Sequence, residues 1–211
     1  MICRTLSLLV ILVLALPSAE ASELQQAVDK APPGAVIELG TGLYEGNITI
    51  SKPLTIRGTE PHATVRGNGK GSVITVTSPF VTIENLTIEK SGEEHQTVDA
   101  GVTVRGAHHV KIVGNVIRDC LFGVNFEQTN QSIIENNRIR SKQRSLGLRG
   151  DGIRLWYSHA NHIRLNHTTD VRDNVFWYSS ANKIQDNVGR DSRYSLHFMY
   201  ADRNEVVRND Y

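Results

Sequence analysis

The chain has 211 residues, and its 23 basic and 22 acidic side chains leave a formal net charge of +1. A chain so close to neutral lacks the positive field with which proteins attract nucleic acid, which argues against nucleic acid as a partner. Beyond the first twenty-odd residues, no stretch is long and apolar enough to predict a membrane-spanning helix.

Residues 1–21 have the pattern of a secretory signal peptide. Arg4 precedes an apolar run over residues 6–16, and Ala19 and Ala21 supply the small residues of a cleavage site before Ser22. The apolar run is too short to span a bilayer as a stable helix. We therefore predict that the chain is exported and that its mature domain covers residues 22–211.

A short helix is predicted at the start of the mature domain. Residues 22–31 contain good helix formers behind a serine cap, and Pro32, Pro33 and Gly34 end the pattern. This helix is expected to cover the first coil of the repeats that follow, because an open end of a stacked β-structure exposes unpaired backbone groups.

From Gly101 onward the sequence repeats about every 22 residues. Each repeat places an isoleucine or valine three residues before an asparagine. The asparagines, which are 22, 29, 21 and 22 residues apart, are Asn115, Asn137, Asn166, Asn187 and Asn209. The interval of 29 contains residues 141–150, predicted to form a protruding loop. A weaker copy over residues 81–91 aligns with residues 110–120, and its excess is the polar stretch 92–99.

The repeats predict strands, because apolar residues alternate with polar ones in runs such as Val110/Ile112 and Ile163/Leu165. The dense leucine ladder of leucine-rich repeats is absent. Three short strands in each 22-residue coil predict an all-β parallel β-helix with coils about 4.8 Å apart. Asparagine is expected at the bends, because it tolerates left-handed backbone and its amide can bond to the same amide one coil away.

Two further features concern the ends of the coils. Cys120, the only thiol that would remain after signal cleavage, takes the repeat position of Ser91 and Ser192 and is expected to be buried. The sequence stops at Tyr211 in mid-repeat, so we expect either a longer protein or another element over the last coil.

Three consecutive coils carry aligned aromatic residues, with tryptophans and a methionine in one column and tyrosines in the next. The columns are Trp156, Trp177 and Met199, then Tyr157, Tyr178 and Tyr200, with Leu155, Phe176 and Phe198 facing the opposite way. If the phenylalanines point inward, the tryptophans and Met199 point outward beside Arg154 and His197. Such a column either stiffens neighbouring coils or forms a binding site.

His197 and Met199 lie two residues apart on one predicted strand and would project from the same face. Imidazole and thioether together favour copper, particularly Cu(I), over zinc or magnesium. A neighbouring tryptophan could also offer its ring face to a cation. These two residues are the candidate metal ligands.

An alternative function is that of a polysaccharide lyase, hydrolase or epimerase acting on acidic sugars. Asp119, Asp170 and Asp191 share a repeat column, and carboxylates on adjacent coils can divide acid and base roles. Arg172 and Arg193 follow two of them by two residues, which favours simple charge pairing instead. The enzyme would need a carboxylate cluster beside an open groove lined with basic residues.

Several of these segments resemble the NosD family of periplasmic proteins required for the maturation of nitrous oxide reductase. The resemblance rests on residues 151–158, 177–180 and 192–200, and on residues 31–35 and 43–46 near the start. This sequence has Ser195 where the family commonly has glycine, and Asn174, Val175 and Phe176 where it has a more aliphatic run.

The resemblance implies a right-handed parallel β-helix in the periplasm, forming the N-terminal portion of a longer protein. It also implies work with the ATPase and membrane subunits of an ABC transporter. The cargo would be copper or a sulfur species for the reductase, delivered directly or through a copper chaperone. We therefore favour a non-enzymatic protein with copper ligands His197 and Met199 and with partner-binding residues Trp156, Trp177, Arg154, Tyr157, Tyr178 and Tyr200.

Overall fold

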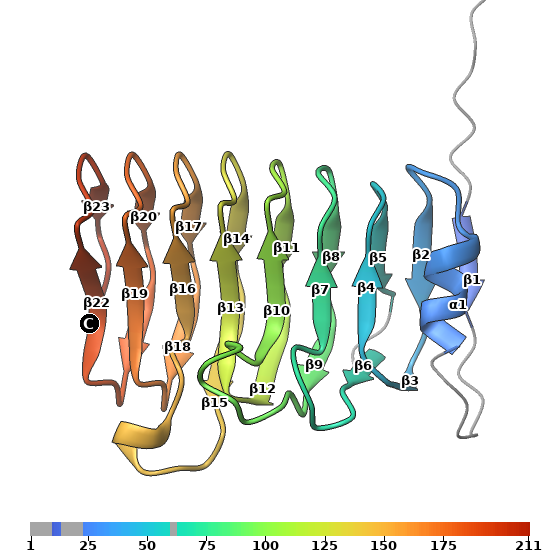
Figure 1. Ribbon diagram of the computed structural model, residues 1–211, viewed down its shortest axis with the longest axis horizontal. Coiled ribbons are helices and arrows are strands. Elements are labelled where there is room, and N and C mark those ends of the chain that lie inside the picture. The colour runs from blue at the N-terminus through green and yellow to red at the C-terminus, as the bar shows by residue number, and fades with distance from the viewer. Residues whose placement is uncertain (1–9, 14–22, 60–62) are drawn as a thin grey trace, which may run out of the picture.

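The computed structural model describes residues 10–13, 23–59 and 63–211. Short strands wind through successive coils that stack along one axis, with the N-terminal helix α1 at one end and the coil of β21, β22 and β23 at the other (Figure 1). Each strand pairs in parallel with its counterpart one coil on, which builds three parallel sheets. This confirms the predicted parallel β-helix.

The first sheet, in spatial order, contains β1 (Val10–Val13), β2 (Val36–Leu39), β5 (Thr55–Gly58), β8 (Thr82–Glu84), β11 (Lys111–Val113), β14 (Ile133–Glu135), β17 (His162–Arg164), β20 (Lys183–Gln185) and β23 (Glu205–Val207). The second contains β4 (Ile48–Ile50), β7 (Ile74–Val76), β10 (Ala100–Arg105), β13 (Phe122–Glu127), β16 (Ile153–Trp156), β19 (Asp173–Trp177) and β22 (Tyr194–Met199). The third contains β3 (Gly42–Glu45), β6 (Ala63–Arg66), β9 (Thr87–Glu89), β12 (Val116–Cys120), β15 (Arg138–Ser141), β18 (His167–Thr169) and β21 (Val188–Arg190).

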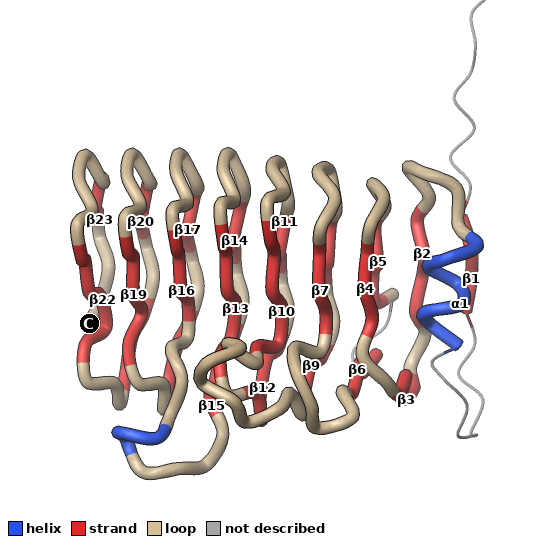
Figure 2. Tube along the Cα trace, in the orientation of Figure 1, coloured by secondary structure: helices blue, strands red, loops and turns tan. Residues whose placement is uncertain are grey.

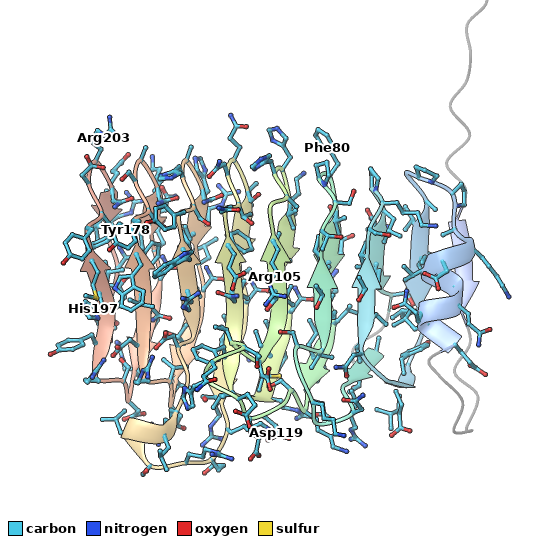
Figure 3. The ribbon with its side chains drawn as sticks, viewed as in Figure 1. Phe80, Arg105, Asp119, Tyr178, His197 and Arg203 are labelled. Atoms are coloured by element: carbon cyan, nitrogen blue, oxygen red, sulfur yellow. The ribbon has the colours of Figure 1, made fainter. Side chains whose placement is uncertain are left out.

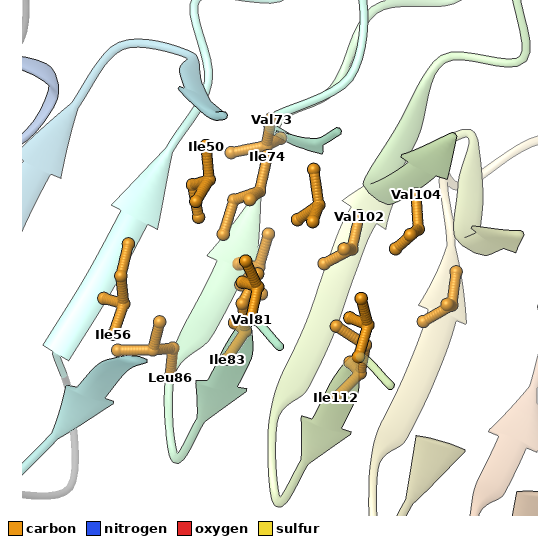
Figure 4. Close-up of a cluster of buried hydrophobic side chains, with 14 of the residues drawn as sticks. Ile50, Ile56, Val73, Ile74, Val81, Ile83, Leu86, Val102, Val104 and Ile112 are labelled. Carbon is orange, nitrogen blue, oxygen red and sulfur yellow. The ribbon is translucent and has the colours of Figure 1, made fainter. Parts of the chain in front are cut away.

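The core is made of like residues stacked along the axis. In the first sheet, aligned positions form a column of Ile37, Ile56, Ile83, Ile112, Ile134, Ile163, Ile184 and Val206. The isoleucines are buried, whereas Val206 in the last coil is 45% exposed. Figure 4 shows side chains of the first sheet, such as Ile83 and Ile112, and of the second, such as Ile74 and Val102, in the buried core. Burial of each of these side chains contributes about 1.5–3 kcal/mol, so the repeat itself supplies the stability of the fold.

The asparagine column forms a continuous ladder inside the coils. Asn115 Nδ2 donates to Asn137 Oδ1 at 3.0 Å, and the same bond recurs from Asn137 to Asn166, Asn166 to Asn187 and Asn187 to Asn209. The predicted amide bonding is confirmed. The prediction that these asparagines themselves take the left-handed backbone conformation is wrong.

The residue before each ladder asparagine takes the left-handed conformation instead. These residues are Gly114, Asn136, Leu165, Asp186 and Arg208, with φ between 51° and 68°. Asn136, Leu165 and Arg208 are exposed, and a glycine and an aspartate occupy the other two bends, so this position accepts varied residues. The asparagine position does not, because its amide must satisfy buried backbone groups.

Helix α1 (Glu23–Lys30) caps the first coil as expected, burying Leu24 and Val28 against it. The Gln25 side chain accepts a hydrogen bond from Thr49 N at 2.7 Å and donates to Thr49 O at 3.1 Å. The Gln25 amide therefore makes the two hydrogen bonds with Thr49 that the backbone of a further coil would otherwise make. Lys52 Nζ donates to the carbonyls of Asp29 and Ala31, both at 2.7 Å, and closes the end of the helix.

The predicted signal peptide lies mostly outside the described residues. Of residues 1–21, the structure describes β1, which pairs in parallel with β2. Cleavage before Ser22 would remove β1 and leave that edge of β2 free. The signal peptide therefore stays a prediction. Within the described ranges, no helix has the length and apolar character needed to cross a membrane.

The two predicted inserts leave the regular coil between the second and third sheets (Figure 2). Residues 142–150 form a loop with the short 3-10 helix η1 (Leu146–Leu148). Residues 92–99 contact this loop, because Arg144 pairs with Glu93 and His95 Nε2 lies 3.2 Å from Leu148 O. Both inserts therefore lie where the chain enters strands of the second sheet, just before β10 and β16.

Candidate functional site

The last three coils of the second sheet align the predicted site residues. Trp156 is paired with Trp177 and Trp177 with Met199, while Arg154, Val175 and His197 form the neighbouring outward column. Leu155 and Phe176 are buried inside the coil. Phe198 continues their column but is 37% exposed, because it belongs to the last coil. The tryptophans and Met199 therefore lie on the outer face of the second sheet.

The tyrosines form a stack at the end of these strands. Tyr157 and Tyr178 have ring centroids 4.8 Å apart, Tyr178 and Tyr200 5.1 Å, with interplanar angles of 8° and 5°. All three take the left-handed backbone conformation, with φ of 47–52°. That conformation is costly for aromatic residues, so stacking contacts across three coils help to offset local strain.

Trp156 packs edge-on against Tyr157 and Tyr178 of this stack. Trp156 lies 5.0 Å from Trp177 and 5.5 Å from Tyr178, measured between ring centroids. We call the six residues Trp156, Trp177, Met199, Tyr157, Tyr178 and Tyr200 the aromatic surface. Tyr157 is 44% and Tyr200 77% exposed, and both tryptophans are half-buried. The surface thus combines mutual support with accessible ring area.

Arg154, predicted to bind a partner, lies partly beneath this surface. Its guanidinium carbon is 5.2 Å from the centroid of Trp156, and Nη1 donates to Asn125 Oδ1 at 2.9 Å. Burial lowers the pKa of the guanidinium below its ordinary value. In this structure Arg154 supports Trp156 by a cation–π contact.

His197 and Met199 alternate along β22 and so project from one face, and Figure 3 shows His197 and Tyr178 on neighbouring coils at the C-terminal end. His197 Nδ1 lies 3.7 Å from Asp173 Oδ2, and the ring of Tyr194 lies 5.1 Å away. Among the described residues, His197 Nδ1 and Trp177 Nε1 are two of three buried side-chain nitrogen or oxygen atoms without a hydrogen-bond partner. Unpaired polar atoms are uncommon in packed regions, so these two atoms mark the part of the outer face around Trp177 and His197 as a candidate binding site.

The donor set tests whether copper fits. One imidazole and one thioether make a soft pair suited to Cu(I), but only two of the ligands that a closed site needs. Within residues 10–13, 23–59 and 63–211, no three His, Cys, Asp or Glu side chains gather in a way that could hold a metal ion. The residues therefore fit an open site for transient binding, to which another molecule would add ligands.

Sequence reasoning missed Asp173 and Tyr194. Asp173 is buried, with its side chain 3% exposed, and it accepts hydrogen bonds from Arg193 Nε at 3.1 Å and from Tyr194 N at 3.1 Å. A carboxylate at the start of a strand carries no obvious sequence signature. The spacing Asp173/Val175/Trp177, in alternation, would have placed it on the same face as the tryptophan.

The expected arginine partners were wrong. Arg172 bonds to Asp151 at 3.0 Å and Arg193 to Asp173, rather than to Asp170 and Asp191. Arg172 and Arg193 lie just before β19 and β22, and each side chain reaches an aspartate one coil earlier. Burial raises the pKa of Asp151, partly countered by the charge of Arg172.

The aspartate column of the sugar-enzyme alternative lies at bends. Asp119, Asp170 and Asp191 have φ of 49–53°, and Figure 3 shows Asp119 at the lower edge, away from Arg105 on the second sheet. Asp170 Oδ2 accepts a bond from Arg140 Nε at 2.8 Å, and Lys142 Nζ lies 3.4 Å from Asp119. The carboxylates of Asp119 and Asp170 are thus engaged by cations.

A hollow of about 300 Å³ lies on the second sheet near its N-terminal end. It is lined by Asn47, Ile48, Thr49, Gly71, Ser72, Thr75, Thr97, Asp99 and Arg105. Asp99 accepts bonds from Thr97 Oγ1 and Glu94 N, while Arg105 bonds to Glu127 at 2.9 Å. The hollow therefore has one carboxylate rather than the acid and base pair that glycoside cleavage uses.

Cys120 is fully buried, as predicted, and burial raises the pKa of its thiol to about 12. A thiol in this state is a poor nucleophile and a poor metal ligand at neutral pH. Among the described residues, Met199 is therefore the sulfur donor that can meet another molecule.

Comparison with known families matches residues 47–149 and 139–211 to the family described as periplasmic copper-binding protein (NosD). The chain belongs to the NosD family. One NosD relative, named a probable ABC transporter binding protein, from Pseudomonas aeruginosa, is 33% identical over 169 residues. That match covers 79% of this chain and 39% of the relative. The equally named protein of Stutzerimonas stutzeri is 30% identical over 142 residues, which cover 64% of this chain and 31% of the relative. The chain thus spans about two fifths or less of these NosD proteins.

Solved structures share the fold of this NosD chain at low identity. An alginate lyase from Paenibacillus sp. str. FPU-7 has a TM-score of 0.58 at 19% identity, covering 79% of this chain and 72% of that one. The A-module of the Azotobacter vinelandii mannuronan C-5 epimerase AlgE4 has a TM-score of 0.55 at 14% identity, covering 88% and 71%. At such identities the likeness shows the parallel β-helix alone.

Proposed function

We propose that this chain is part of an exported, periplasmic accessory protein that acts with an ABC transporter to supply copper, or a sulfur species, for the copper centres of nitrous oxide reductase. The family description and the names of the two relatives support copper binding and an ABC transporter partner. The role in maturing the reductase rests on the resemblance of the signature coils.

The observation that carries the proposal is the outward column Trp156, Trp177 and Met199 beside His197. It places a soft donor pair at the edge of an aromatic surface. A two-donor site binds copper loosely enough to release it, and the adjacent rings give a partner a surface on which to dock. Transfer of copper to a partner requires loose binding of the ion and docking of the partner at the same place.

Copper binding is tested by titrating Cu(I) in competition with a chelator. His197→Ala and Met199→Ala should each weaken binding at least about tenfold, the equivalent of about 1.4 kcal/mol. His167→Ala is the matched control, because His167 is an exposed histidine on the third sheet. Equal Cu(I) affinities for wild type and both site variants would contradict the assignment of His197 and Met199 as copper ligands.

The docking role has a separate test. Trp156→Ala combined with Trp177→Ala should keep the far-ultraviolet circular dichroism of the β-helix but abolish recovery of the transporter subunits in pull-down from periplasm and membranes. Copper loading of the reductase should fall in parallel. Phe80→Ala is the control, since Phe80 is 62% exposed on a distant bend. Retention of partners by the double variant would contradict the assignment.

A further inference from the structure

Asp173 lies beside His197 in a way that restricts the imidazole. Asp173 Oδ1 accepts hydrogen bonds from Arg193 Nε and Tyr194 N, each at 3.1 Å. Its Oδ2 accepts from Arg193 Nη2 and faces His197 Nδ1 at 3.7 Å. Two donors hold Oδ1 in place, so Oδ2 is the atom presented to the histidine.

The orientation of this carboxylate decides which ring nitrogen is protonated. A carboxylate oxygen only accepts hydrogen bonds, so it favours the tautomer with hydrogen on Nδ1. His197 Nδ1 is buried and makes no hydrogen bond within the described residues, so the Asp173 carboxylate acts on it through charge at 3.7 Å. The lone pair is then on Nε2, and the ring of Tyr194 at 5.1 Å limits rotation of the imidazole.

We propose that Asp173 is a positioning residue that fixes the Nδ1–H tautomer of His197 and so presents Nε2 to a soft metal ion. The inference rests on the proposed function only for the identity of what Nε2 binds. Histidines that bind metals commonly donate their other ring nitrogen to a carboxylate, and loss of that partner lowers affinity about 10–100-fold.

Asp173→Asn offers a sharp test because its amide would be oriented by the same neighbours. Arg193 Nε and Tyr194 N both require an acceptor, so the amide oxygen takes the place of Oδ1. The NH2 group then faces His197 and Arg193. A donor opposite Nδ1 favours the other tautomer, with hydrogen on Nε2. The substitution should therefore reverse the tautomer rather than merely loosen the ring.

The chain provides a matched control one coil earlier. Asp151 is also buried, with its side chain 2% exposed, and is held by Arg172 Nε at 3.1 Å. No contact between Asp151 and a histidine is found in the described part of the chain. Asp151→Asn therefore repeats the chemical change without touching His197. Arg193→Gln gives a second variant, since it removes the guanidinium but leaves the Asp173 carboxylate.

The experiment is nitrogen NMR of histidine-labelled protein, free of copper, at an alkaline pH where imidazoles are neutral. Wild type, Asp151→Asn and Arg193→Gln should show the Nδ1–H pattern for His197, and Asp173→Asn the Nε2–H pattern. Cu(I) affinity of Asp173→Asn should fall about 10–100-fold. A wild-type Nε2–H tautomer, or no change in Asp173→Asn, would overturn the inference. The expected tautomers without any Cu(I) binding would instead refute only the proposed function.

Discussion

Replacing Asn166 tests whether the asparagine ladder is a main support of the fold. Its Nδ2 donates to Ile134 O at 2.8 Å and to Asn187 Oδ1 at 3.0 Å, and its Oδ1 accepts from both the backbone and side-chain nitrogens of Asn137 at 3.0 Å. Asn166 is buried at 1% exposure. Asn166→Ala therefore removes four hydrogen bonds of about 1 kcal/mol each and should lower the free energy of unfolding by about 4 kcal/mol.

Asn209 provides the comparison, because it occupies the same column in the last coil and is half-buried. It also bonds to Asn187 and to Ile184 O at 2.9 Å, but water can replace these contacts. Asn209→Ala should cost about 1 kcal/mol. Equilibrium urea denaturation, followed by circular dichroism, measures both. Equal losses for the two variants, or a loss below about 1 kcal/mol for Asn166→Ala, would refute the role assigned to the buried ladder.

Three further predictions follow from burial and charge. With a pKa of about 12 rather than 9.0, Cys120 should react with a thiol reagent at pH 8 about a thousandfold more slowly in the folded protein than after unfolding. The raised pKa of Asp151 means that the folded state holds its proton more tightly, so this group's contribution to stability declines as pH rises above 3.8. In urea denaturation, the free energy of unfolding of Asp151→Asn relative to wild type should therefore be higher at pH 7 than at pH 4. Lys52→Met removes two charged hydrogen bonds from the end of α1 and should cost about 2 kcal/mol, with faster amide hydrogen exchange in residues 23–30 as the check.

The repeat made the architecture readable from the amino-acid sequence. Alternating apolar residues specify which side chains enter the coil, and a constant spacing specifies which residues stack, because parallel strands in register bring equivalent positions together. For this reason the columns of Ile112 and Ile134, and of Trp156, Trp177 and Met199, follow from alignment alone. The two inserts are visible as departures from the same period.

Only the tertiary structure determines which side chains pair with one another at the coil corners. Arg172 and Arg193 lie just before β19 and β22, and they pair with Asp151 and Asp173 of the preceding coil instead of with Asp170 and Asp191. The contact between Asp173 and His197 lies where the register shifts between β19 and β22. The left-handed bends likewise fall one residue before the ladder asparagines. A repeat period determines stacking along the axis, whereas these contacts depend on the path of the chain around each corner.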